Sequence, residues 1–266
     1  MTPELDSHLR TLVNFPSPPG VASHIIQLAQ DPNIEMGKVA KAIGMDPALA
    51  TKVLRIANSP LYAQRRRSEN LRQALIVLGL NATLTLALSF SLVKSLRGGK
   101  PNGVNHPLYW RRALLAATSS RALGEASGQT LLEELFLAGL LQDIGMLALD
   151  KAVPDLYRDT ADLQKNHREL AAHERKRLGF DHADTGAWMM RQWNLPERLC
   201  AAIAGSHKLD NRRVLDPADG FNRCVSISGG MVDIFLQQDE RKPFQETAQQ
   251  VERVFGLGKE EFGRVI

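Results

Sequence analysis

The chain has 266 residues, 44% of them hydrophobic, which fits one large globular domain or two lobes. Its net charge of +4 is uneven, because residues 1–98 carry +5 and residues 99–266 carry −1; the first part therefore allows an acidic partner without requiring one. The absence of an apolar run of about 18 residues argues against a membrane span. The first ten residues lack the basic-then-apolar layout of a signal peptide. Cys200 and Cys224, the two cysteines, lack the spacing of metal ligands, so we expect reduced thiols in a cytoplasmic protein.

The first hundred residues show helical periodicity interrupted by proline and glycine. Proline in 16–20 marks a break and presets the first turn of the next helix. Asp46 stands where an N-cap is expected, directly before Pro47. The helices predicted here are 4–13, one after Gly20, about 35–43, 47–58, and two between Leu71 and Leu96 that meet at a corner containing Gly79.

The clearest linker is the glycine- and proline-rich segment from Arg97 to Pro107. We therefore predict an N-terminal lobe at 1–98, a linker at 99–108 and a second lobe at 109–266. The helices predicted in the second lobe are 109–126, 131–150, one beginning at Pro154, about 167–178, one after Pro196, and the last ones after a polar loop at 208–220. Because no stretch alternates with period two, the predicted fold class is all-α, with a helical bundle lobe packed on a second helical lobe.

The stretch from Leu131 to Asp150 is apolar on almost every side, which predicts a buried helix. It nevertheless carries Gln142 and Asp143 at its centre. A buried carboxylate needs a charge partner, a metal ion or several hydrogen bonds. Asp143 is therefore either a structural acid tied to a fixed donor or the remnant of a metal site.

This stretch resembles the signature of the HD superfamily of metal-dependent phosphohydrolases, with Gln142 in place of the histidine and Met146 in place of the lysine. The wider pattern resembles the HDOD family, the HD-related output domain of bacterial signalling proteins, which is generally regarded as non-catalytic. The matching landmarks keep their order over roughly residues 10–235: 15–19, 46–49, 55–59, 74–79, 109–110, 138–145, 179–183 and 193–196. The run LLQDIGMLAL further resembles HDOD regions that precede a GGDEF diguanylate cyclase domain.

The resemblance carries the metal pattern over position by position. The first histidine is matched by Arg112, the central one by Gln142 beside Asp143, the third by His182, and the later pair by Ser206 and His207. A guanidinium cannot bind a cation, and an amide is a weak ligand for a transition metal. The degenerate pocket is thus Arg112, Gln142, Asp143, His182, Ser206 and His207, for which we expect neither a stoichiometric metal nor another cofactor, and no phosphoester hydrolysis.

Asp143 then needs another source of neutralising charge. Arg112 occupies the matching place, so we expect these two residues to form an ion pair, with Gln142 or His182 as further donors. Two alternatives stay open: a residual metal-dependent phosphohydrolase, and a pocket that binds an anion or nucleotide without turnover. The remaining histidines show no mutual spacing that indicates a ligand set; they are His8, His24, His106, His167 and His173.

Two basic features allow other interpretations. Residues 38–58 loosely match a helix-turn-helix, with Lys41, Lys52 and Arg55 nearby. Asp46 would stand at the start of the reading helix, where it would repel DNA phosphates, so two packed bundle helices are the preferred interpretation and nucleic acid is not an expected partner. The run Arg65, Arg66 and Arg67 is either a solvated loop or a contact for an acidic partner or a phosphate.

The resemblance implies a non-catalytic regulatory module. We expect it to couple a cue to an output through protein–protein contacts with a signalling protein or an attached domain, with a GGDEF cyclase as one candidate for that domain. The chain ends at 259–266 within an expected helix, which suggests a fragment of a longer protein. The sequence leaves open the cue, the identity of the partner and the formation of a homodimer.

Overall fold

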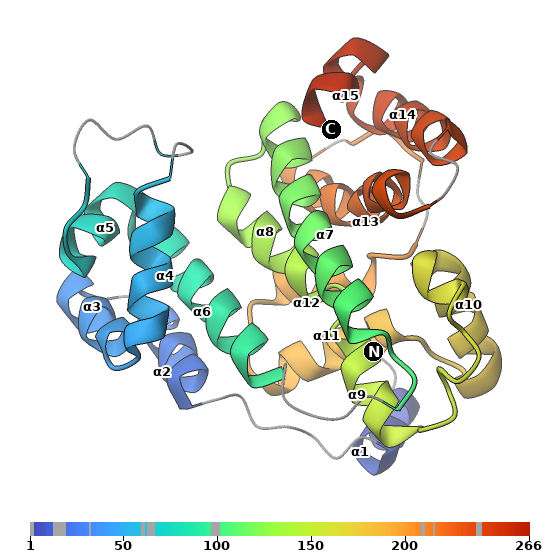
Figure 1. Cartoon of the computed structure of the whole chain (residues 1–266), viewed down its shortest axis with the longest axis horizontal. Helices are drawn as coiled ribbons and strands as arrows, with labels where there is room; N and C mark the ends of the chain where they lie inside the picture. Colours follow the sequence, from blue (N-terminus) through green and yellow to red (C-terminus); the bar gives the residue numbers. More distant parts are fainter. Residues whose placement is uncertain are drawn as a thin grey trace. The chain divides into compact units, whose positions relative to one another are not determined.

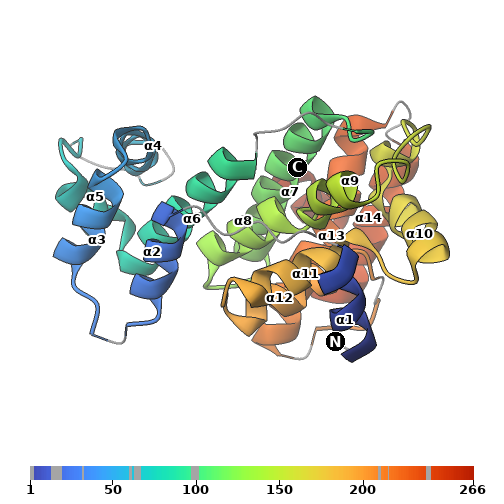
Figure 2. The ribbon, with the colours of Figure 1, turned by 90° about the horizontal axis from the view of Figure 1, so that it is seen from below.

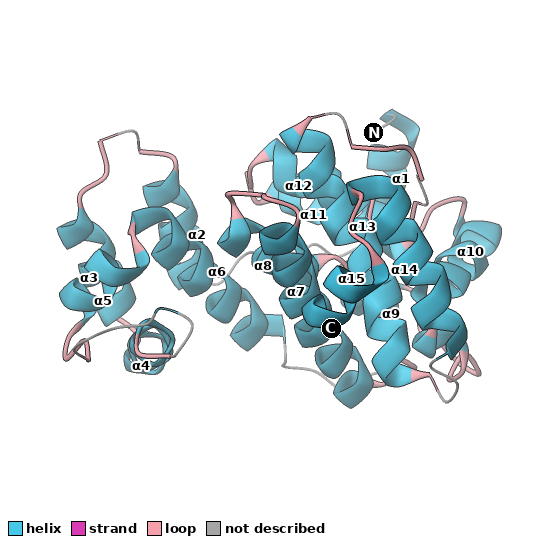
Figure 3. Ribbon diagram, turned by 90° about the horizontal axis from the view of Figure 1, so that it is seen from above, coloured by secondary structure: helices cyan, strands magenta, loops and turns pink. Residues whose placement is uncertain are grey.

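The computed structural model of the chain is entirely helical where it describes regular structure, in agreement with the predicted all-α class (Figure 3). The described residues are 3–12, 20–31, 33–59, 62, 67–96, 102–208, 211–214, 216–237 and 241–266. Long helices with apolar faces and capped ends account for this architecture, because each helix can satisfy its own backbone hydrogen bonds while burying one side.

The chain folds as two compact units, one of residues 16–99 and one of residues 1–15 together with 100–266. The change of unit after Gly99 lies one residue beyond the predicted end of the first lobe at 98. The N-terminal segment differs from the prediction, because α1 (Pro3–Leu12) belongs with the larger unit. There the buried indole of Trp188 donates a hydrogen bond of 2.8 Å to Asp6. Figure 2 shows α1, in dark blue, beside the later helices of that unit.

The smaller unit contains α2 to α6. Asp46 caps α4 as predicted, since its carboxylate accepts hydrogen bonds from the backbone amides of Ala48 and Leu49 at 3.0 and 3.2 Å. Gly79 makes the corner between the last two helices with φ +80°, a value that favours glycine. The bounds are α2 (Gly20–Ala29), α3 (Met36–Gly44), α4 (Pro47–Ala57), α5 (Leu71–Leu78) and α6 (Leu80–Leu96).

Of the predicted basic loop, the structure describes only Arg67, which is exposed; Arg65 and Arg66 lie outside the described residues. Among the described helices, none is by itself both long and apolar enough to cross a membrane. The pair Leu71–Leu78 and Leu80–Val93 passes that test by length and composition when taken together, with a bend of 114° between its members.

Neither the wild type nor a charge-reversed variant of the would-be DNA-reading surface should bind DNA sequence-specifically. The carboxylate of Asp46 accepts the N-terminal backbone hydrogen bonds of α4. The ammonium group of Lys52 lies 5.3 Å from the centre of the Phe90 ring, in the same unit, and forms a cation–π contact with it. We expect wild-type protein and Lys52→Glu alike to show only weak, salt-dependent binding that does not distinguish one duplex sequence from another. Fluorescence anisotropy with labelled duplexes at two salt concentrations tests this. Sequence-specific binding that disappears in Lys52→Glu would instead support the helix-turn-helix interpretation.

The larger unit is built around α7 and α8, which pack against each other and against α13 (Figure 1). The helix predicted to begin at Pro154 is absent; residues 153–162 form turns and bends, closed by local bonds such as that from the Thr160 hydroxyl to the Tyr157 carbonyl. The bounds in this unit, besides α1, are α7 (His106–Ala126), α8 (Leu132–Leu141), α9 (Gly145–Ala152), a 3₁₀ turn (Leu163–Lys165), α10 (His167–Leu178), α11 (His182–Gln192), α12 (Glu197–Ala204), α13 (Pro217–Leu236), α14 (Arg241–Phe255) and α15 (Lys259–Val265).

The central apolar stretch is two helices rather than the single one that was predicted. Residues 142–144 form a tight turn between α8 and α9, in which the amide of Met146 donates to the Asp143 carbonyl at 3.0 Å. The break coincides with Gly145, which lies so close to the His182 carbonyl and the Gly186 amide of α11 that a Cβ atom would overlap them. All residues from 137 to 150 are buried, as expected. Asp143 is therefore presented from a buried turn.

Candidate functional site

Four buried side chains converge where the ends of four helices meet. Asp143 lies in the turn before α9, His167 and His182 are the first residues of α10 and α11, and His207 follows the end of α12. Each can offer one oxygen or nitrogen atom, and these four atoms all lie within 4.8 Å of one another. We call these four residues the His–Asp cluster.

Helix capping fixes two of the histidines. Asn166 caps α10 by accepting a hydrogen bond from the Glu169 amide, which places His167 at the first helical position. Asp181 caps α11 within a capping box completed by Asp184, which does the same for His182. The backbone positions of both histidines are thus set by local structure, and the turns of the chain bring their side chains to Asp143.

The distances within the cluster are those of direct polar contacts. The Nδ1 atom of His167 is 2.8 Å from Oδ2 of Asp143. On the other carboxylate oxygen, Oδ1, Nε2 of His207 lies at 3.0 Å and Nε2 of His182 at 3.4 Å. The two Nε2 atoms are 2.7 Å apart. Both oxygens of Asp143 therefore face imidazole nitrogens.

A second carboxylate orients His182 from behind. Oε2 of Glu174 is 2.6 Å from Nδ1 of His182 and accepts a hydrogen bond of 2.7 Å from the His182 backbone amide. The Tyr157 hydroxyl donates to the other oxygen of Glu174 at 2.7 Å. With Nδ1 occupied by Glu174, His182 directs Nε2 toward Asp143.

Burial and charge act in opposite directions on these groups. Burial alone would raise the pKa of Asp143, but His167, His182 and His207 hold that pKa well below its usual range. Burial would lower the pKa of His182, yet Glu174 and Asp143 raise it to about 10. Burial, with help from the Arg112 charge, lowers the pKa of His167 to about 3, and burial beside His182 also lowers that of His207. Asp143 is thus ionised, and His182 carries the most stable proton.

Arg112 is buried beside the cluster, but its closest partner differs from the predicted one. Its Nε lies 3.9 Å from Oδ2 of Asp143, which is a long ion pair. One terminal nitrogen donates to Asp233 at 2.7 Å and to the Lys165 carbonyl at 3.2 Å, and the other donates to the Gly229 carbonyl at 3.3 Å. The guanidinium therefore links Asp143 to α13, and histidines make the short contacts to Asp143.

The other two residues of the predicted pocket are buried but remain outside the cluster. The Ser206 hydroxyl donates to the Ile203 carbonyl at 2.8 Å, within the end of α12. Neither the amide nitrogen nor the amide oxygen of Gln142 has a hydrogen-bond partner among the described residues. Gln142 or His182 was the predicted further donor to Asp143; His182 is the one that contacts it, at 3.4 Å, whereas Gln142 makes no such bond.

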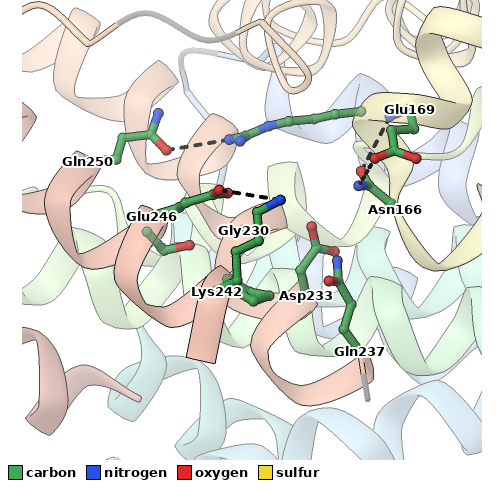
Figure 4. Close-up of a pocket in the computed structure, with 11 residues that line it drawn as sticks. Asn166, Glu169, Gly230, Asp233, Gln237, Lys242, Glu246 and Gln250 are labelled. Atoms are coloured by element: carbon green, nitrogen blue, oxygen red, sulfur yellow. Dashed lines mark hydrogen bonds and ion pairs between the residues drawn. The ribbon is translucent and has the colours of Figure 1, made fainter. Parts of the chain in front are cut away.

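Asp233 also lines a pocket of about 300 Å³ (Figure 4). Its walls come from α10, α13 and α14, and they are mostly polar: Asn166, Arg168, Glu169, Gly230, Asp233, Gln237, Lys242, Pro243, Glu246, Thr247 and Gln250. The half-buried guanidinium of Arg168 donates a long hydrogen bond of 3.4 Å to Gln250. None of these lining residues is aromatic, so a nucleobase would find no stacking partner among them.

His167 is the site residue that sequence reasoning missed. It was set aside because its spacing from the other histidines shows no pattern, and the structure brings it to Asp143 through the turns at 153–162 and the 3₁₀ turn before α10. The available signal was local: Asn166 is a strong N-cap, which places His167 at the start of a helix. That signal shows where the helix begins, but it does not show which other part of the chain the His167 side chain will meet.

The cluster fits a transition-metal ion by the chemistry of its donors. Three imidazoles and one carboxylate are ligands that zinc and related divalent ions use. Asp143 Oδ2 and His167 Nδ1 are both buried and form no well-oriented hydrogen bond, although they are 2.8 Å apart. A proton on His182 Nε2 and a metal ion would compete for the same lone pair. Asp143, His167, His182 and His207 are therefore the residues that could hold such an ion.

Comparison with known proteins places these features in a family context. The model of the family described as HDOD domain matches residues 15–209. An HDOD domain protein of unknown function from Geobacter sulfurreducens superposes with a TM-score of 0.77 at 20% identity, covering 98% of this chain and 92% of that one. A candidate phosphohydrolase from Shewanella amazonensis SB2B gives 0.71 at 21% identity, with 96% and 89% covered. At these identities the likeness concerns the fold.

Two further matches bear on signalling and on length. The MmoQ response regulator from Methylococcus capsulatus str. Bath is 28% identical, with a TM-score of 0.52 and 92% and 94% of the two chains covered. An uncharacterized protein from Treponema pallidum is 24% identical over 199 residues, which are 74% of this chain and 38% of that protein. The chain thus spans well under half the length of the curated relative that it matches.

Proposed function

The chain belongs to the HDOD domain family, and we propose that it is a non-catalytic signal-transduction module that regulates an output, or an attached domain, through protein–protein contacts. The observation that carries this proposal is the buried guanidinium of Arg112. It lies 3.9 Å from Asp143 and is fixed by Asp233 and two backbone carbonyls. A metal-dependent hydrolase needs space and negative charge beside its ion for a bound water and a phosphate substrate.

Arg112 works against hydrolysis in two ways. Its fixed positive charge lowers the affinity of the adjoining space for a cation, and its side chain fills the volume between Asp143 and Asp233. Gln142 adds to this, because a neutral amide stands where the HD pattern has an imidazole. Together these two residues remove the elements that a second ion or an activated water would require.

The signalling role draws support from the relatives. The MmoQ chain, which is 28% identical, is described as a response regulator, and the longer Treponema relative leaves room for a further domain. The proposal of a diguanylate cyclase as that domain rests on the resemblance of the run LLQDIGMLAL to HDOD regions that precede GGDEF domains. The polar pocket lined by Asp233, Arg168 and Lys242 offers a place where a small anion could bind without being turned over and act on Arg112 through Asp233.

The four-residue cluster keeps a residual phosphohydrolase as the second candidate. The two functions differ in turnover. We expect purified protein, supplied with Mn²⁺, Fe²⁺ or Zn²⁺, to hydrolyse bis(p-nitrophenyl) phosphate and cyclic di-GMP no faster than the metal salts alone. Release of p-nitrophenolate and chromatography of the dinucleotide measure this. Turnover that is lost in a folded Asp143→Ala variant would establish the phosphohydrolase and refute the non-catalytic proposal.

A further inference from the structure

We infer that Asp143, His167, His182 and His207 form a closed four-ligand site for one zinc-like dication, in which His167 supplies the imidazole that Gln142 lacks. The sequence alone predicted no stoichiometric metal because Arg112 and Gln142 replace two imidazole positions of the HD pattern. The structure adds His167 as a fourth, 2.8 Å from Asp143. This inference deepens the proposed function, because an ion enclosed by four protein ligands has no open position for a hydrolytic water.

The size of the cluster matches a tetrahedral site. Zinc binds imidazole nitrogen at about 2.0–2.1 Å, so the ligand atoms of a tetrahedral site lie about 3.3 Å apart. The contacts in the cluster run from 2.7 to 3.4 Å, and all four ligand atoms fall within 4.8 Å of one another. An ion can therefore be accommodated by small rotations of the four side chains, while helix caps hold the backbones of His167 and His182.

The orientation of His167 supports convergence on a shared ion. Its Nδ1 and Oδ2 of Asp143 are 2.8 Å apart, close enough for a hydrogen bond, yet neither atom forms a well-oriented one. Two buried polar atoms left in this way carry a desolvation cost. A cation that accepts a lone pair from His167 Nδ1 and one from Asp143 Oδ2 would remove this desolvation cost. A direct hydrogen bond between the two atoms does not, because its geometry is not met.

The surroundings of His182 are those of a metal ligand. Glu174 contacts Nδ1 at 2.6 Å and is itself held by Tyr157, which fixes the tautomer that leaves Nε2 free for an ion. The charges also fit, since the ion pair with Asp233 at 2.7 Å offsets part of the Arg112 charge, which disfavours a second ion more than the one held by the cluster. The negative charges of Asp143 and Glu174 then remain to balance a dication.

The test is metal binding by the full chain after removal of bound metal with a chelator. We expect one Zn²⁺ per chain by elemental analysis, a higher melting temperature with Zn²⁺, and the intense visible absorption of tetrahedral Co²⁺ on titration with cobalt. In His167→Gln, the Zn²⁺ affinity should fall by more than about 100-fold, since even the loss of an outer-shell partner costs about 10–100-fold. His173→Gln is the matched control, because His173 belongs to the same helix and lies outside the cluster.

Each result decides one question. A wild-type chain that binds neither Zn²⁺ nor Co²⁺ overturns the inference, and this outcome does not depend on how any variant folds. Wild-type binding that is equally strong in a folded His167→Gln variant overturns the assignment of His167. A bound ion together with phosphodiester turnover supports the site and refutes the non-catalytic proposal, so failure of the site and failure of the proposed function can be told apart.

Discussion

Replacing Arg112 with methionine should lower the free energy of unfolding by about 3–5 kcal/mol, the usual cost of removing one member of a buried ion pair. The change strands Asp233, whose 2.7 Å contact with Arg112 is its closest charge contact, and it also removes the more distant charge beside Asp143. Chemical denaturation of the wild type and the variant measures the difference. Arg111→Met is the matched control, because Arg111 is exposed on the same helix and should change stability by less than about 0.5 kcal/mol.

Second-site changes identify which carboxylate depends on Arg112. Combining Arg112→Met with Asp233→Leu should recover much of the lost stability, because the stranded charge is removed with its partner. Combining Arg112→Met with Asp143→Leu should recover less stability. This second change removes the carboxylate that three histidines contact, so it adds a loss of its own. Equal recovery by both combinations, or none, would mean that Arg112 is not bound to α13 as the structure shows.

Replacing Gly145 with alanine should destabilise the larger unit by about 3 kcal/mol or more, at the upper end of overpacking costs. The added methyl group would overlap the backbone of His182 and Gly186, which cannot rotate away as a side chain would. The same strain would move the turn that presents Asp143, so metal binding should weaken as well. Thermal or chemical unfolding, together with Zn²⁺ titration, measures both effects.

The control for Gly145 is a glycine with open space around it. Gly263 lies within α15, and a Cβ atom there meets nothing within 4 Å. Gly263→Ala should be neutral or should stabilise the protein by up to about 1 kcal/mol, because alanine has the higher helix propensity. A Gly145→Ala variant as stable as Gly263→Ala would show that α9 and α11 are not packed as closely as described.

The fold could be predicted from the sequence to the extent that its signals are local. Three caps could be read from the sequence and stand at helix boundaries in the structure. Asp46, before Pro47, begins α4. Gly79, between two apolar runs, ends α5, and Gly179, after a basic turn, ends α10. The break at Gly145 could not be found in this way. The apolar pattern continues across it, and the residues that lie against Gly145 belong to α11, about forty residues further along the chain.

The candidate site shows the same limit. Asp143, His182 and His207 could be carried over from a family pattern, and the structure brings them together. His167 could not, because its position depends on how the turns at 153–162 fold back. The partner of Arg112 was assigned to Asp143 by matching positions, whereas Asp233 reaches it from α13, an element that the matched pattern did not include. Contacts between distant elements set these pairings, and spacing along the chain does not report them.

The most direct test of a non-catalytic site is the rate of phosphodiester hydrolysis by metal-loaded wild-type protein, measured beside the double variant Arg112→His, Gln142→His. The double variant returns two imidazoles to the pattern and removes the guanidinium that lies between Asp143 and Asp233. The account predicts no turnover above the metal control for the wild type, with any activity confined to the double variant. Wild-type turnover that disappears in a folded Asp143→Ala variant would contradict it.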